Sequence, residues 1–142
     1  MSTRSAIIMK TQEGYAGIYC HFDGYESGVG QTLLDHYSGE GKASADKVAS
    51  LIALGDISVL DRRVEPTGPH QFSNRETGTT LAYHRDRGED WDDVKPVVGP
   101  TAQAVAKQIG HNGYVYVFED GRWTCNGREA VEGAFVNDDE DK

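Results

Sequence analysis

Side chains that could bind a metal ion or take part in catalysis are densest in the run 20–25, Cys-His-Phe-Asp-Gly-Tyr. A thiol beside an imidazole could bind a metal ion or act as a nucleophile with its base. This run ends a predicted strand, and adjacent strand residues point to opposite faces of a sheet. Cys20 and His21 therefore cannot readily share one ion, and the sequence has no second Cys-x-x-Cys or His-x-x-x-His pair. We expect no metal and no cofactor.

The nucleophile hypothesis has no support elsewhere in the sequence. Cys20 shares the apolar strand face with Ile18 and Phe22, and no motif pairs it with a distant histidine. We expect Cys20 and Cys125 to be buried, reduced thiols without an essential role. We therefore assign no catalytic residue and favour a binding protein over an enzyme.

A polar surface on the other face of the same strand remains an alternative. Tyr19 and His21 share that face, and a glycine-rich stretch precedes the next predicted helix, although the Walker spacing and its lysine are absent. These features could serve a small, nucleotide-like ligand or a small enzyme. The candidate ligand surface consists of Tyr19, His21, Asp23, Tyr25 and Arg85. The same side chains could instead only form the strand exit and the sheet edge.

An acidic segment, 86–93, places a tryptophan among like charges. It has five acids and one base, a net charge of −4. Trp91 is either an anchor that fixes this segment to the core or an exposed hot spot, because tryptophan is enriched at binding hot spots. We expect 86–93 to form an exposed loop that contacts a protein with a basic surface. The candidate partner-binding residues are Glu89, Asp90, Trp91, Asp92 and Asp93.

The overall charge is consistent with a protein partner. The 142 residues carry a formal charge of −9, and residues 138–142 add a second acidic cluster of −3. Direct nucleic-acid binding needs a basic footprint that displaces counterions, so we do not expect it. The apolar run 6–9 is too short for a signal sequence or a spanning helix. We therefore expect a cytoplasmic protein without a membrane contact and leave its oligomeric state open.

The hydrophobic periodicity predicts an α+β fold in the order ββ-αα-ββ-α-ββ. Strand pairs at 5–11 with 15–22, 71–75 with 79–85, and 114–118 with 122–126 predict an antiparallel sheet built from hairpins. Three short helices, at about 28–37, between Ser44 and Gly55, and from Thr101 to Ile109, should pack on one face of it. The expected buried residues are Ile8, Ile18, Phe22, Leu33, Leu51, Ile52, Val105, Ile109, Val117 and Trp123. We expect 1–136 to form one domain and 137–142 to be an acidic, disordered tail.

The first 60 residues resemble a family of small proteins from tailed-phage and prophage genomes. The resemblance rests on 2–7 (STRSAI), 17–25 (GIYCHFDGY), 28–30 (GVG), Leu33-Leu34, His36-Tyr37 and 54–58 (LGDIS), and the strand 114–118 also fits. The resemblance implies that the chain is encoded by a phage accessory gene and acts in the host cytoplasm. It does not imply a particular reaction. Phage accessory proteins of this size commonly bind and inhibit a host protein, including components of bacterial defence.

Overall fold

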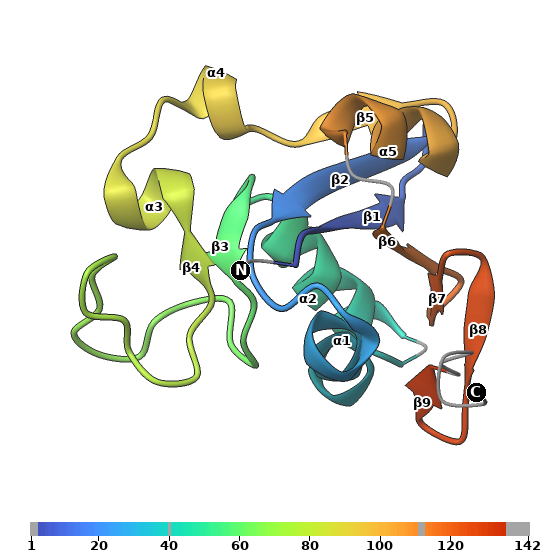
Figure 1. The fold of residues 1–142 in the computed structure, drawn as a ribbon, viewed down its shortest axis with the longest axis horizontal. Coiled ribbons are helices and arrows are strands. Elements are labelled where there is room, and N and C mark those ends of the chain that lie inside the picture. The colour runs from blue at the N-terminus through green and yellow to red at the C-terminus, as the bar shows by residue number, and fades with distance from the viewer. Residues whose placement is uncertain (1–2, 40, 111–112, 136–142) are drawn as a thin grey trace.

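The computed structural model describes residues 3–39, 41–110 and 113–135 (Figure 1). The predicted tail, 137–142, lies outside the described residues. The strands are β1 (Ser5–Lys10), β2 (Tyr15–Cys20), β3 (Ile57–Val59), β4 (Leu81–Ala82), β5 (Val97–Gly99), β6 (Tyr114–Glu119), β7 (Arg122–Cys125), β8 (Arg128–Val131) and β9 (Ala134–Phe135). The helices are α1 (Gln31–His36), which follows a π-helical turn at Glu26–Gly30, α2 (Lys42–Ile52), α3 (Tyr83–Arg87), α4 (Trp91–Val94) and α5 (Ala102–Ile109).

The sheet is mixed, so the prediction of a purely antiparallel sheet was wrong. The strand order is β4-β3-β2-β1-β6-β7-β8-β9, and β5 also pairs with β2. The hairpins β1–β2 and β6–β7 form as predicted, but β1 pairs parallel with β6 and β2 pairs parallel with β3. A helical connection, α1 and α2, joins β2 to β3, and such a crossover brings the next strand in parallel.

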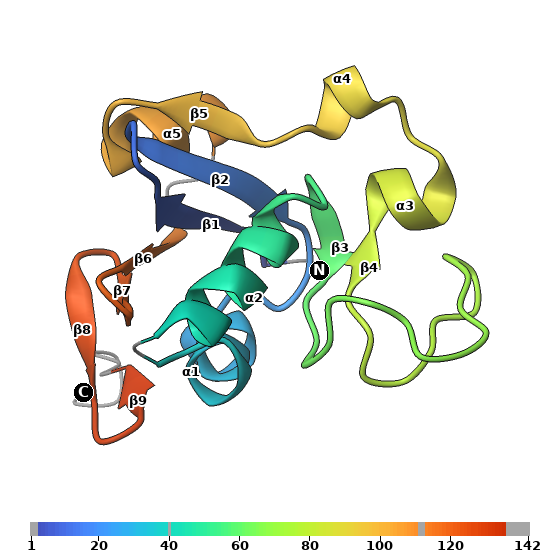
Figure 2. The ribbon, with the colours of Figure 1, turned by 180° about the vertical axis from the view of Figure 1, so that it is seen from behind.

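Helices cover both faces of the sheet, which corrects the prediction of a single helical face. Figures 1 and 2 show α5 on one side of β1 and β2, and α1 with α2 on the other. The larger core, under α1 and α2, includes Ile7, Ile18 and Trp123, whereas Ile8 packs with Val105 of α5. The continuous apolar run in β1 fits this arrangement, because strands buried on both faces lose their polar alternation.

Seven of the ten predicted core residues are buried: Ile8, Ile18, Leu33, Leu51, Ile52, Val105 and Trp123. Ile109 and Val117 are only half-buried. Phe22 is 41% exposed. β2 ends at Cys20, so the alternation that would have buried Phe22 stops before reaching it. Cys20 and Cys125 are both buried and unbridged.

The predicted hairpin of 71–75 with 79–85 does not form. The chain from 61 to 80 is instead a loop fixed by polar contacts. The hydroxyls of Thr67 and Thr79 each donate to the Glu76 carboxylate at 2.6 Å, and Arg75 Nη1 donates to Asp61 Oδ2 at 2.9 Å. The hydrogen bonds that Glu76 accepts, from Thr67 above all and then from Thr79, lower its pKa to about 2. The loop ends in the two-residue strand β4, after which the chain turns into α3.

None of the helices in the described ranges is both long and apolar enough to cross a membrane.

Candidate partner-binding site

Trp91 begins the short helix α4 and rests against Gly55, which follows α2. Gly55 has φ +80°, and a Cβ placed on it would lie 3.1 Å from Trp91 Cζ3 and 2.5 Å from the Val94 carbonyl oxygen. The ring of His84, in α3, contacts the indole edge-on at a centroid distance of 5.0 Å. The Trp91 side chain is nevertheless 37% exposed. Trp91 is therefore packed against Gly55 and His84 while more than a third of it stays exposed.

The local sequence explains why α4 forms at this point. The Asp90 carboxylate accepts a hydrogen bond from the backbone N–H of Asp92 at 3.1 Å and caps the helix. Asp92 and Asp93 lie in the first turn, where the helix dipole favours negative charge. The predicted loop at 86–93 is therefore partly helical, with an exposed turn between α3 and α4.

The acidic side chains around Trp91 are only partly neutralised. Glu89 accepts from Arg87 Nε at 2.7 Å, and Asp92 lies 3.6 Å from Lys95 Nζ. Asp90 and Asp93 form no ion pair with any described residue. Four carboxylates and two cations leave a charge of −2 between positions 87 and 95. We call Glu89, Asp90, Trp91, Asp92 and Asp93 the Trp91 surface.

Asp86, counted in the acidic segment at the sequence level, does not belong to this surface. Its side chain is only 5% exposed and contacts His70 Nε2 at 3.1 Å. Burial alone would raise the pKa of Asp86, but hydrogen bonds from Arg85, the Ala82 N–H and His70 outweigh burial and lower it. Asp86 thus holds α3 against β4, and its charge is not available to a partner.

The alternative ligand surface comes together only in part. The Tyr19 hydroxyl and His21 Nδ1 are 2.5 Å apart, and the Tyr25 hydroxyl donates to Asp23 at 3.0 Å. Arg85 is engaged elsewhere: its guanidinium donates to the Val64 and Thr80 carbonyls, both at 2.6 Å. The Tyr19–His21 and Tyr25–Asp23 pairs lie near the end of β2, whereas Arg85 supports the 61–80 loop.

Asp56 is a residue of this region that the sequence analysis did not identify. Its Oδ1 accepts from the Tyr19 N–H at 3.0 Å, its own N–H donates to the Val94 carbonyl at 2.7 Å, and its carbonyl accepts from the Tyr83 N–H at 3.2 Å. Burial raises the pKa of Asp56 to about 6, opposed by the hydrogen bond from Tyr19. A single acid before a short strand carries no motif, so only the fold reveals that it joins β2 to α3 and α4.

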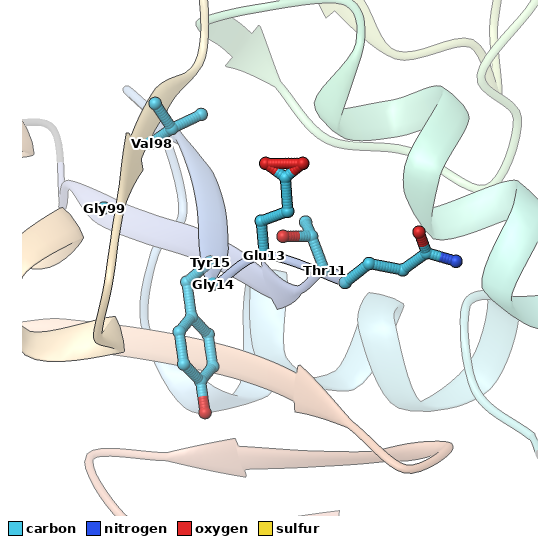
Figure 3. Close-up of a pocket in the computed structure, with 7 residues that line it drawn as sticks. Thr11, Glu13, Gly14, Tyr15, Val98 and Gly99 are labelled. Atoms are coloured by element: carbon cyan, nitrogen blue, oxygen red, sulfur yellow. The ribbon is translucent and has the colours of Figure 1, made fainter.

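The hollow drawn in Figure 3 lies away from these residues. It measures about 580 Å³ and is formed by the β1–β2 turn and β5, from Thr11, Gln12, Glu13, Gly14, Tyr15, Val98 and Gly99. Figure 3 shows Tyr15 pointing away from Glu13, and its hydroxyl donates to Glu119 at 2.8 Å. Glu13 is the one charged residue of its lining. Within the described residues, no three His, Cys, Asp or Glu side chains are grouped to hold a metal ion.

Comparison of the chain with protein-family models, with curated proteins and with solved structures finds no match in any of the three. The residues themselves and their geometry therefore have to support a function.

Proposed function

We propose that the protein binds another protein through the Trp91 surface, and that the partner presents basic residues around an apolar pocket. The observation that supports this proposal most is the state of Trp91. It is an aromatic side chain held in place by Gly55 and His84 yet 37% exposed, inside a segment, 87–95, whose net charge is −2.

The physical argument combines preorganisation with steering. An indole fixed before binding loses little conformational freedom in the complex, so more of its burial appears as affinity. Exposed carboxylates around it raise the rate of encounter with a basic surface and exclude acidic partners. Because the backbone of α4 is attached to β3 through the Asp56 N–H, the surface stands on the rigid sheet rather than on a mobile loop.

The biological setting follows from the resemblance to phage and prophage proteins described above. On that basis we propose that the partner is a host protein of the bacterial cytoplasm, such as a component of bacterial defence, and that binding inhibits it by occupying its surface, without catalysis. No catalytic group is required for this action.

A second candidate function is the binding of a small, nucleotide-like ligand at the end of β2. The Tyr19–His21 contact favours it, together with the exposed rings of Phe22 and Tyr25, which are 41% and 39% exposed. Because Arg85 is engaged in the 61–80 loop, this surface would need another cation. Arg4 is a candidate, because burial raises the pKa of Tyr19 and the charge of Arg4 acts against this rise.

A paired capture experiment tests the proposal. The intact chain is immobilised beside Trp91→Ala and beside Tyr25→Ala, which removes a similarly exposed aromatic from the other surface. We expect one host protein to be retained stoichiometrically by the wild type and by Tyr25→Ala but lost from Trp91→Ala. Retention by a folded Trp91→Ala would reject the Trp91 surface. A melting-temperature shift with nucleotides, abolished by Tyr25→Ala, would support the second candidate.

A further inference from the structure

One face of the sheet is only partly covered by the described elements. α5 packs over β1, β2 and β5. Val115 and Val117 of β6 touch the cluster beneath α5 but remain half-buried. Figure 1 shows β7 and β8 continuing away from α5 toward the C-terminal strands. The uncovered part of this face therefore begins where α5 ends its contact with the sheet.

This uncovered face is hollowed along its length. A hollow of about 760 Å³ lies between α5 and β6–β7, and one of about 400 Å³ continues across β7 and β8. The two share Val117, Thr124 and Gly127 in their linings. We call the joined hollows the β6–β7 trough. Small or branched side chains, Ala102, Ala106, Val115, Val117 and Thr124, line the larger hollow, and another chain could approach closely over them.

The charges of the trough are separated along it. Lys107 lines the end next to Val115, where the Val115 N–H donates to the Asn126 side chain. Glu119, Asp120 and Arg122 line the other end and Glu129 of β8 lies beside Thr124, three acids and one base with a net charge of −2. Val115 and Glu119 are four residues apart on one strand, which separates the two ends by about 13 Å.

We propose that the β6–β7 trough binds a second copy of this chain, related to the first by a two-fold axis through Val117 and Thr124. A cationic end, an apolar centre and an acidic end are complementary to the same surface turned by half a revolution. The two-fold sets Lys107 of each copy against the acidic end of the other, so the charge contact occurs twice. This oligomeric state is independent of the Trp91 surface, which lies on α4.

The net charge of −9 opposes self-association at long range. Physiological salt screens exposed charges beyond about 8 Å, whereas opposed ion pairs in the trough would be closer than that. We therefore expect the dimer to be weaker at very low ionic strength than at physiological salt.

Sedimentation velocity on the intact chain tests the proposal, from about 1 to about 200 μM, the range in which weak specific dimers assemble. We expect a concentration-dependent dimer for the wild type. Lys107→Glu and Glu129→Lys, both at exposed positions, should each weaken it by about tenfold or more because each sets like charges face to face. Lys42→Glu, whose side chain is 87% exposed on α2, is the charge-matched control and should leave the dimer intact.

A mixture of the two single variants gives the decisive result. In a heterodimer of Lys107→Glu with Glu129→Lys, both charge contacts are opposite in sign again, so the mixture should associate more tightly than either variant does alone. A wild type that stays monomeric throughout the range would overturn the proposal. A wild-type dimer that both variants retain, or a mixture that remains monomeric, would also overturn it, because the contact would then lie elsewhere.

Discussion

The Asp56 carboxylate and the backbone N–H of Tyr19 are joined by a hydrogen bond of 3.0 Å, which ties the end of β2 to the start of β3. The backbone of Asp56 also bonds Val94 and Tyr83, so one residue connects the two surfaces considered for binding. The carboxylate is partly buried, and its pKa of about 6 lies well above the ordinary 3.8. Such a shifted group near a candidate site deserves a direct test of its role.

Asp56→Asn should stabilise the fold at pH 8 and have little effect at pH 4. The folded state holds the Asp56 proton more tightly than the unfolded state does. The stability that this proton gives the fold is therefore fully present below about pH 4 and is lost as the pH rises through about 6. Asparagine keeps the acceptor oxygen without the buried charge. We expect the melting temperature to rise by a few degrees at pH 8, whereas Asp46→Asn, with a side chain 62% exposed, should change nothing. An equal gain at both pH values would contradict the titration.

Gly55→Ala should displace α4 and lower stability. The added Cβ would lie 2.5 Å from the Val94 carbonyl oxygen at φ +80°. Gly88→Ala is the matched control, because Gly88 has φ +76° with open space around it. Both variants bear the left-handed strain of about 1 kcal/mol or more, but only Gly55→Ala adds a clash. Urea unfolding should therefore place Gly55→Ala below Gly88→Ala; equal losses would show that Trp91 and Val94 move aside without cost.

Glu76→Gln should loosen the 61–80 loop at neutral pH. Hydrogen bonds from Thr67 and Thr79 hold the pKa of Glu76 at about 2, below its ordinary value of 4.5. The ionised side chain therefore stabilises the loop fully above about pH 4.5, and this stabilisation is lost as the pH falls toward 2. Limited proteolysis at pH 7 should cut the variant within 61–80 several times faster than the wild type, and the difference should shrink near pH 3. Identical cleavage rates at pH 7 would contradict the role given to Glu76.

The two thiols should be unreactive in the native protein. Burial raises the pKa of Cys20 to about 12 and that of Cys125 to about 11, so neither forms thiolate near neutrality. A maleimide at pH 7 should label neither cysteine until urea unfolds the chain, when both should react. Rapid native labelling of Cys20, followed by loss of partner binding, would revive the nucleophile hypothesis.

Local signals predicted the elements that local contacts determine. Thr101 caps α5 by accepting from the Ala104 N–H, and Gly110 ends it at φ +90°, both as the sequence indicates. Asp120 and Gly121 both have positive φ in the turn that joins β6 to β7. These features depend on residues within a few positions of one another, where backbone preference dominates.

Long-range contacts determined what the sequence could not show. α3 and α4 are too short to form on intrinsic preference alone; Asp86 stabilises the first through Ala82 and Arg85, and Trp91 fixes the second on Gly55. The parallel pairing of β1 with β6 likewise joins segments more than 100 residues apart. Of the candidate sites, the Trp91 surface stays together, while Arg85 separates from Tyr19 and His21 because its donors are used in the 61–80 loop.

The most direct test of the Trp91 surface is the equilibrium affinity for the captured partner, measured across a salt series for wild type, Trp91→Ala and Asp92→Lys/Asp93→Lys, with folding checked by melting temperature. Trp91→Ala should lose about 2 kcal/mol of binding free energy or more. Asp92→Lys/Asp93→Lys should associate more slowly, with a flatter salt dependence. Glu13→Lys/Asp46→Lys, which reverses two exposed acids elsewhere, should bind as the wild type does. Folded Trp91 and Asp92/Asp93 variants that keep the wild-type affinity and salt dependence would contradict the proposal.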